Sequence, residues 1–355
     1  MTAATAPGSG RTGTFSQAAL PDWAMQVVMG GAVALAFIGI AFTDVSPALL
    51  VIVLAAVSAA TIGIWAGTVE GRRKATDRLA TMTMTYAFLL AVAPLVSLAW
   101  TVVSKGNGRL DLDFINHTMR NVIGEGGGAM HAIWGTVIIT GVATIIAVPV
   151  GILTAIYLHE YGGTGRLKKA ITFFVDVMTG IPSIVAGLFA FALFALFFGP
   201  GVRLGVMGSI ALSVLMIPIV VRSTEEMLRI VPNGLRESAF ALGVPKWRVI
   251  TKVVLPTALA GIVTGVMLAI ARVIGETAPL LVTVGTIDSL NFNPFEGRMQ
   301  SLAVFTYFEY KTPGVPPEPS FDRAWAAALT LIIIVLVLTG IAKLVQRRFG
   351  VLQAR

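Results

Sequence analysis

The sequence contains no cysteine and few charged residues. None of the 355 residues is a cysteine, which excludes disulfide bonds, cysteine-ligated zinc and thiol catalysis. Only 12% of the residues are charged, whereas 56% are hydrophobic, and the mean hydropathy is +0.85. One soluble core cannot bury this much apolar surface. The composition therefore predicts an all-α membrane protein that crosses the bilayer several times.

Enzyme motifs are also missing. The glycine-rich stretches GGTGRLKK and GEGGGAM have neither the spacing of a phosphate-binding loop nor a preceding strand. No G-x-S-x-G elbow occurs, and the three histidines, His117, His131 and His159, lack metal-ligand spacing. We therefore predict that this chain is not an enzyme and binds neither a metal nor another cofactor.

Long apolar segments dominate what is present. Windows about 20 residues wide, the length that crosses a bilayer, find eight spans. These spans are residues 25–43, 47–67, 80–103, 131–158, 171–198, 206–223, 257–284 and 323–345. Residues 1–22 are small and polar without the apolar core of a signal peptide, which predicts a disordered cytoplasmic tail.

The net charge of +8 predicts membrane topology rather than nucleic-acid binding. The basic residues cluster at 72–78, at 166–169 and at 343–355, between or after apolar spans. All three clusters fall on one side if both termini are cytoplasmic, as the positive-inside rule requires. The opposite side then carries the long segment 285–322 with the aromatic piece MQSLAVFTYFEY, which is either a surface cap or a gate or partner contact.

Residues 222–256 form a polar connection that is expected to contain a short helix. Asn233 is a candidate N-cap, and Gly243 suits a left-handed C-terminal position. Small residues allow close approach of another surface, and two apolar residues can anchor it. The predicted docking residues are Glu237, Ser238, Ala239, Phe240, Leu242 and Gly243. Docking into a groove of a partner is one interpretation, and a helix lying on lipid headgroups is the other.

The stretch ARVIGETAPLL places two opposite charges inside an apolar span. Arg272 and Glu276 are four residues apart, so a continuous helix would place them on one face. Charges at this depth are costly, and they usually face a protein interior or an aqueous path. Arg272, Gly275, Glu276 and Thr277 are the predicted substrate path, and a structural ion pair is the alternative.

Helix-breaking residues concentrate in two spans. Pro279 frees a backbone carbonyl one turn earlier, so its helix is expected to kink or unwind near Gly275. Gly180, Pro182, Ser183 and Gly187 have the same effect in residues 171–198. We predict a moving interface at these positions, although close helix packing explains each glycine by itself. Asp176 is the main further carboxylate in the membrane.

The polar connection resembles a known motif. Glu237-Ser238-Ala239, Gly243, Val253 and Leu255-Pro256 match the spacing of the EAA loop of ATP-binding-cassette importer permeases, with serine replacing alanine and valine replacing isoleucine. In that family the loop is the coupling helix that docks on an ATPase. AVPVGILTAIYLHEY, TGIPSIVAGLFAF and ARVIGETAPLL add a resemblance, over residues 80–350, to the PstA family of phosphate importer permeases.

The resemblance implies a six-helix type I importer core, to which residues 23–79 add an N-terminal hairpin and basic loop. It further implies a homologous C-type permease, two copies of an ATPase that holds ATP and Mg²⁺, and an external phosphate-binding protein. The chain would then carry inorganic phosphate across the inner membrane of a bacterium by alternating access. A permease for another substrate, and an ion-gradient-driven transporter or channel acting alone, are the alternatives.

Overall fold

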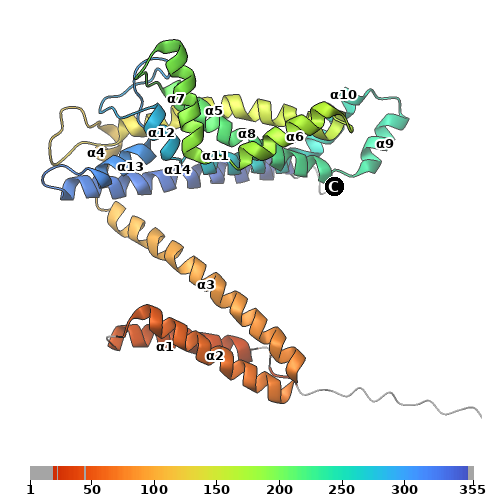
Figure 1. The fold of residues 1–355 in the computed structure, drawn as a ribbon, viewed down its shortest axis with the longest axis vertical. Helices are drawn as coiled ribbons and strands as arrows, with labels where there is room; N and C mark the ends of the chain where they lie inside the picture. Colours follow the sequence, from red (N-terminus) through yellow and green to blue (C-terminus); the bar gives the residue numbers. More distant parts are fainter. Residues whose placement is uncertain (1–18, 22, 44, 351–355) are drawn as a thin grey trace, which may run out of the picture. The chain divides into compact units, whose positions relative to one another are not determined.

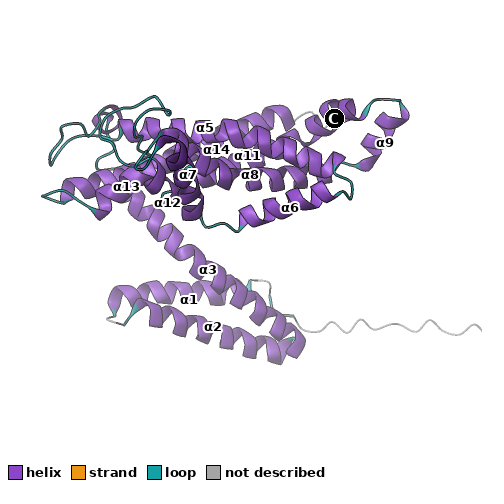
Figure 2. Cartoon of the chain, turned by 45° about the horizontal axis from the view of Figure 1, so that its top comes forward, coloured by secondary structure: helices purple, strands orange, loops and turns teal. Residues whose placement is uncertain are grey.

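The chain is helical throughout its described part. The computed structural model describes residues 19–21, 23–43 and 45–350, and within these residues every regular element is a helix (Figure 2). The chain divides into two compact units, Met1–Ala99 and Trp100–Arg355. The boundary lies inside the long helix α3, Arg72–Gly106. The predicted all-α class is confirmed.

The first unit contains the additional N-terminal helices. It comprises α1 (Ala24–Phe42), α2 (Pro47–Val69) and the first part of α3. The glycine at 39 lets the first two helices approach, because a Cβ at that position would lie 2.4 Å from Leu50 Cδ2. The predicted disordered tail, residues 1–22, lies largely outside the described residues.

One buried carboxylate ties the start of α3 to the segment before α1. The Glu70 side chain is 1% exposed, and its Oε2 lies 2.6 Å from Arg78 Nε. Its Oε1 accepts a hydrogen bond of 2.8 Å from the backbone N–H of Leu20. The hydrogen bond from the Arg78 guanidinium lowers the pKa of Glu70, although burial opposes the shift.

The second unit is a helical bundle with short helices at both ends. Its elements are α4 (Leu112–Asn116), α5 (Met130–Ile156), η1 (Tyr157–Tyr161), α6 (Arg166–Thr179), α7 (Ser183–Phe198), α8 (Gly205–Ile230), α9 (Asn233–Ala241), α10 (Lys246–Val249), η2 (Ile250–Val254), α11 (Leu255–Val273), α12 (Ala278–Thr283), α13 (Leu302–Lys311) and α14 (Glu318–Gly350). Helices α9 and α10 lie at one end of this unit, and α4 and α13 lie toward the other (Figure 1).

The core of the second unit lies between α5, α8 and α11. Small residues bring these helices close together, as they do in other membrane bundles. Ser209 Oγ on α8 donates a hydrogen bond of 3.0 Å to the Ile139 carbonyl on α5. A Cβ at Gly151 would lie 2.7 Å from Val220 Cγ1. Such close contacts give the bundle a rigid centre.

The number of candidate membrane spans agrees with the sequence. In the described residues, seven helices are long and apolar enough to cross a membrane, or eight if the bent pair α6 and α7 counts as one span. The apolar span predicted at 171–198 is bent, because α6 and α7 meet at an angle of 110°, and the bend lies at the helix-breaking residues that the sequence indicates. Residues 257–284 are likewise divided into α11 and α12.

The polar connection is shorter than the sequence indicates. Helix α8 continues to Ile230, and a continuous candidate span begins at Lys246. Most of residues 222–256 therefore belongs to the ends of two long helices. Polar side chains extend these helices beyond their apolar parts, which hydropathy alone cannot detect.

The long segment 285–322 folds into an ordered cap. The aromatic piece forms α13, whose first turn is capped by Ser301 Oγ accepting from the Val304 N–H at 3.3 Å. Arg323 on α14 lies 2.9 Å from Glu309 on α13 and donates a hydrogen bond of 2.8 Å to the Gly124 carbonyl. These bonds join the two long connections at this end of the bundle. A gating or partner role for the segment stays a prediction.

Candidate functional site

The short helix α9 has the C-terminal turn that the sequence predicts. Gly243 adopts φ +72°, its N–H donates to the Phe240 carbonyl at 2.9 Å, and the Val244 N–H donates to the Ala239 carbonyl at 3.2 Å. These two bonds form a Schellman motif, which needs the left-handed conformation that glycine adopts without strain. The predicted N-cap is wrong, because the helix begins at Asn233 itself after Pro232.

The predicted docking residues of α9 lie on an exposed surface. Phe240 is 45% exposed and Leu242 is 83% exposed, although both are apolar. Glu237, Ser238 and Gly243 are exposed, and Ala239 is half-buried. Exposed apolar anchors beside small residues are typical of a surface that a partner protein covers.

A buried ion pair attaches α9 to the end of α5. Arg236 Nη2 lies 3.0 Å from Glu160 Oε1 in η1, and the two side chains are only 11% and 9% exposed. The same guanidinium donates to the carbonyls of Leu228 at 2.8 Å and Val231 at 2.7 Å, at the end of α8. Arg236 thereby joins three elements. The position of Arg236 directly before Glu237 is the one sequence signal for this anchor, and the motif-based prediction does not include Arg236.

A second contact reinforces this attachment from α10. The ammonium group of Lys246 bonds the Glu160 carbonyl and lies 4.9 Å from the centre of the Tyr161 ring, a favourable cation–π distance. His159 Nδ1 lies 3.1 Å from Glu160 Oε1. Arg236 in α9 and Lys246 in α10 therefore both bind η1, so the short helix is held at its base while most of its predicted docking residues remain exposed.

The charged pair of ARVIGETAPLL does not share a helix face. Helix α11 ends at Val273, and Glu276 lies in the break before α12. No ion pair joins Arg272 to Glu276 among the described residues. Arg272 is exposed, as is Gly275, whereas Glu276 and Thr277 are half-buried. The prediction of an i, i+4 pair is wrong because the predicted unwinding removes the helix that would align the two residues.

The gating and packing residues come together around α12. A Cβ at Gly187 on α7 would lie 2.6 Å from the Cα of Pro279 and 2.9 Å from its carbonyl oxygen. Only glycine permits this backbone-to-backbone contact. Gly180 directly follows α6, Pro182 precedes α7, and Ser183 begins α7, so these three residues lie at the 110° bend. A role in movement stays a prediction.

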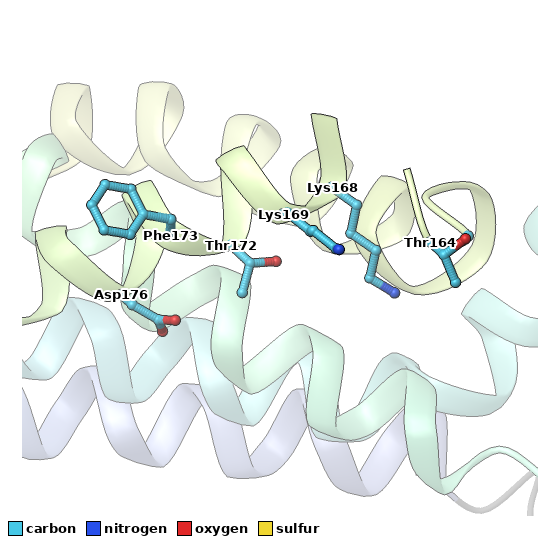
Figure 3. Close-up of a pocket in the computed structure, with 7 residues that line it drawn as sticks. Thr164, Lys168, Lys169, Thr172, Phe173 and Asp176 are labelled. Atoms are coloured by element: carbon cyan, nitrogen blue, oxygen red, sulfur yellow. The ribbon is translucent and has the colours of Figure 1, made fainter. Parts of the chain in front are cut away.

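The further carboxylate, Asp176, lies on α6 with a basic partner. It bonds Arg222 on α8, which also lies 2.8 Å from Glu225. Asp176 lines an open groove of about 510 Å³ together with Lys168 and Lys169 (Figure 3). A carboxylate neutralised by arginine is poorly suited to carrying a coupling ion, so this geometry counts against a gradient-driven carrier.

Comparison with known proteins identifies the family. Residues 147–351 match the family described as "Binding-protein-dependent transport system inner membrane component". The chain is 45% identical over 278 residues to the phosphate transport system permease protein PstA 1 of Mycobacterium tuberculosis (strain CDC 1551 / Oshkosh), covering 78% of this chain and 90% of that protein. This chain belongs to the PstA family. Its members include PstA of Mycobacterium leprae, 48% identical over 74% of this chain and 86% of that protein.

A solved structure supports the fold of an ABC importer permease. A structure of the inward-facing MetNI methionine ABC transporter aligns with a TM-score of 0.50 and 20% identity over 62% of this chain and 95% of that one. As a PstA-family permease, the chain is a multi-pass inner membrane protein and is not itself catalytic. A binding-protein-dependent permease works with a binding protein and a separate ATPase subunit.

Proposed function

We propose that this chain is the permease subunit through which an ATP-driven importer moves inorganic phosphate into the cytoplasm. The observation that carries the proposal is the break between α11 and α12. Arg272 lies there at the end of a membrane span. No carboxylate among the described residues forms an ion pair with its guanidinium group. A guanidinium is a planar fork of donors that matches a tetrahedral oxyanion and stays charged in a low dielectric.

We assign the α9 surface to the ATPase. Phe240 and Leu242 would enter a groove of that subunit. Arg236 would transmit the movement of the ATPase to η1 and α8, which it bonds. The full complex would contain a homologous C-type permease, an ATPase dimer that holds ATP and Mg²⁺, and an external phosphate-binding protein.

The proposed topology places both termini and α9 in the cytoplasm. The basic clusters at 72–78, 166–169 and 343–355 support it. A cysteine introduced near residue 5 should resist an impermeant external reagent, and one at Pro316 should react. The reverse labelling pattern would contradict this orientation.

Uptake of radiolabelled phosphate in cells that lack this chain tests the function. The wild-type chain should restore uptake, whereas Arg272→Gln should lower it at least about tenfold while the complex assembles normally. Arg229→Gln is the matched control, because Arg229 is exposed on α8 and lies outside the proposed path. Normal uptake in an assembled Arg272→Gln complex would exclude the proposed path.

Two further measurements separate the alternative functions. Excess sulfate should not compete with phosphate, and effective competition would indicate a permease for another oxyanion. Uptake should persist when an uncoupler removes the proton gradient and stop when ATP is depleted. The opposite result would identify a gradient-driven carrier.

A further inference from the structure

Two arginines converge on a buried glycine directly after α12. Gly285 adopts φ +72°, and a Cβ there would lie 2.9 Å from Arg203 Cδ, 3.1 Å from Arg203 Nη1 and 3.4 Å from Arg298 Cδ. The two side chains come from segments 95 residues apart, one before α8 and one after α12. A side chain at residue 285 would fill the space that both arginines share.

Neither guanidinium is neutralised within the described part of the chain. No carboxylate forms an ion pair with either one, although Asp288 and Glu296 lie on the same connection. Glu296 instead accepts a hydrogen bond of 3.4 Å from Asn293. Among the described residues, Arg203 Nη1 donates one hydrogen bond, of 3.4 Å, to the Leu281 carbonyl. Both side chains approach Gly285, and an anion bound by the two guanidinium groups would offset the repulsion between their like charges.

The pair lies at the opposite end of α12 from Arg272. Helix α12 has six residues, Ala278–Thr283, so its backbone advances about 9 Å at 1.5 Å per residue. Arg272 precedes this short helix, and Gly285 follows it. The chain thus presents unneutralised arginine at both ends of one rigid element, which α7 holds in place through the contact of Gly187 with Pro279.

We propose that Arg203 and Arg298 form an outer anion station, which holds phosphate after its release from the binding protein and before it reaches Arg272. The proposal rests on the proposed function. Arginine suits this role because two forked guanidinium groups can each donate two hydrogen bonds to one oxyanion. Gly285 is required because it leaves the anion and both side chains room to meet.

Direct protection of the arginines by phosphate tests the station. The purified complex, without the binding protein, is treated with phenylglyoxal, and modification of each arginine is read by mass spectrometry. Phosphate should slow modification of Arg203 and Arg298 several-fold but leave the exposed Arg120 unchanged. Equal modification with and without phosphate would overturn the station, whatever the uptake assay shows.

Uptake by the reconstituted complex provides the second readout. Arg203→Gln with Arg298→Gln should reduce phosphate uptake about tenfold, and the corresponding double lysine variant should keep most of it. Arg120→Gln should have no effect. The double glutamine variant could instead fail to bind the binding protein, while phosphate does not protect the wild-type arginines from phenylglyoxal. That result would mean that the two arginines contact the binding protein, and it would exclude the station. If the wild-type complex takes up no phosphate, the proposed function is wrong. The phenylglyoxal assay then still shows whether Arg203 and Arg298 bind phosphate.

Discussion

The α9 end and the α12 break of this permease are held in place by different means. At the α9 end, Arg236 is buried and bonds Glu160 and two carbonyl groups. At the α12 break, Gly187 contacts Pro279 directly, while Arg272 has no carboxylate partner among the described residues. A neutralised arginine fixes the position of an element. An arginine without a counter-charge remains available to a ligand.

The largest expected effect comes from removing the charged anchor. Arg236→Gln leaves the Glu160 carboxylate buried without its partner, which typically costs about 3 to 5 kcal/mol. We expect a large fall in thermal stability in detergent and loss of the ATPase on purification. Arg248→Gln is the matched control because Arg248 is exposed on α10. The double variant Arg236→Gln with Glu160→Gln should recover part of the stability, and an equal loss would argue against the ion pair as the anchor.

Disturbing the steric anchor should have the next largest effect. Gly187→Val places two methyl groups where the Pro279 backbone lies, and overpacking of this kind costs about 1 to 3 kcal/mol. We expect lower phosphate uptake with normal capture of the ATPase, because the α9 surface is unchanged. Gly141→Val is the control, since no atom lies within 4 Å of a Cβ at Gly141. Loss of ATPase capture by Gly187→Val would mean that the two regions are not independent.

A double-mutant cycle distinguishes two possible roles of Arg272 at the α12 break. If Arg272 only neutralises Glu276, Arg272→Gln with Glu276→Gln should restore much of the uptake that either single change loses. If Arg272 attracts the anion, the double variant should assemble normally and still take up about tenfold less phosphate. We expect the second result. Glu276→Gln alone should keep most of the uptake, because Glu276 forms no ion pair with Arg272 among the described residues.

A smaller loss is expected at the C-terminal turn of α9. Gly243→Val forces a branched side chain into the left-handed conformation, at a cost of about 1 kcal/mol or more. Uptake and co-purification of the ATPase should both fall, while membrane insertion persists. Gly234→Ala provides the control, because Gly234 lies within α9 and no atom is near its Cβ position. Normal coupling in Gly243→Val would count against docking by α9.

The smallest expected effect concerns the ion pair between Glu70 and Arg78, in the first unit. The Arg78 guanidinium lowers the pKa of Glu70 from its ordinary value of 4.5. The stability that this pair contributes is complete above pH 4.5 and decreases as the pH falls through the lowered pKa. Thermal unfolding at pH 7 and pH 4 should show a slight loss that Glu70→Gln abolishes. An unchanged pH dependence in that variant would exclude this pair as its cause.

The sequence predicts continuous spans well and broken spans poorly. Hydropathy locates residues 25–43 and 47–67 almost to the residue, because each forms one uninterrupted helix. Hydropathy predicts one span where the structure has the two helices α11 and α12, since Ile274 and Ala278 are as apolar as their neighbours. Gly275 and Pro279 correctly predict unwinding there. The expectation that Arg272 and Glu276 share one face conflicts with that same prediction.

Local motifs predict the docking surface but not its anchor. Gly243 reveals the turn because only the sequence nearby determines it. The contact between Arg236 and Glu160 joins residues 76 positions apart, so no spacing rule detects it. The arginine pair at Gly285 is similar, because Arg203 and Arg298 approach the same glycine only when the connection after α12 folds back over the start of α8.

The break at residues 274–277 also affects the chain before it finds its partners. Backbone that is not helical is tolerated at membrane depth only where protein or water covers it. Gly275 and Arg272 are both exposed on this subunit, so lipid would face them in a solitary copy. We therefore expect the unassembled subunit to be short-lived, a target for membrane proteases. The supply of its partner subunits would then determine how much transporter a cell accumulates.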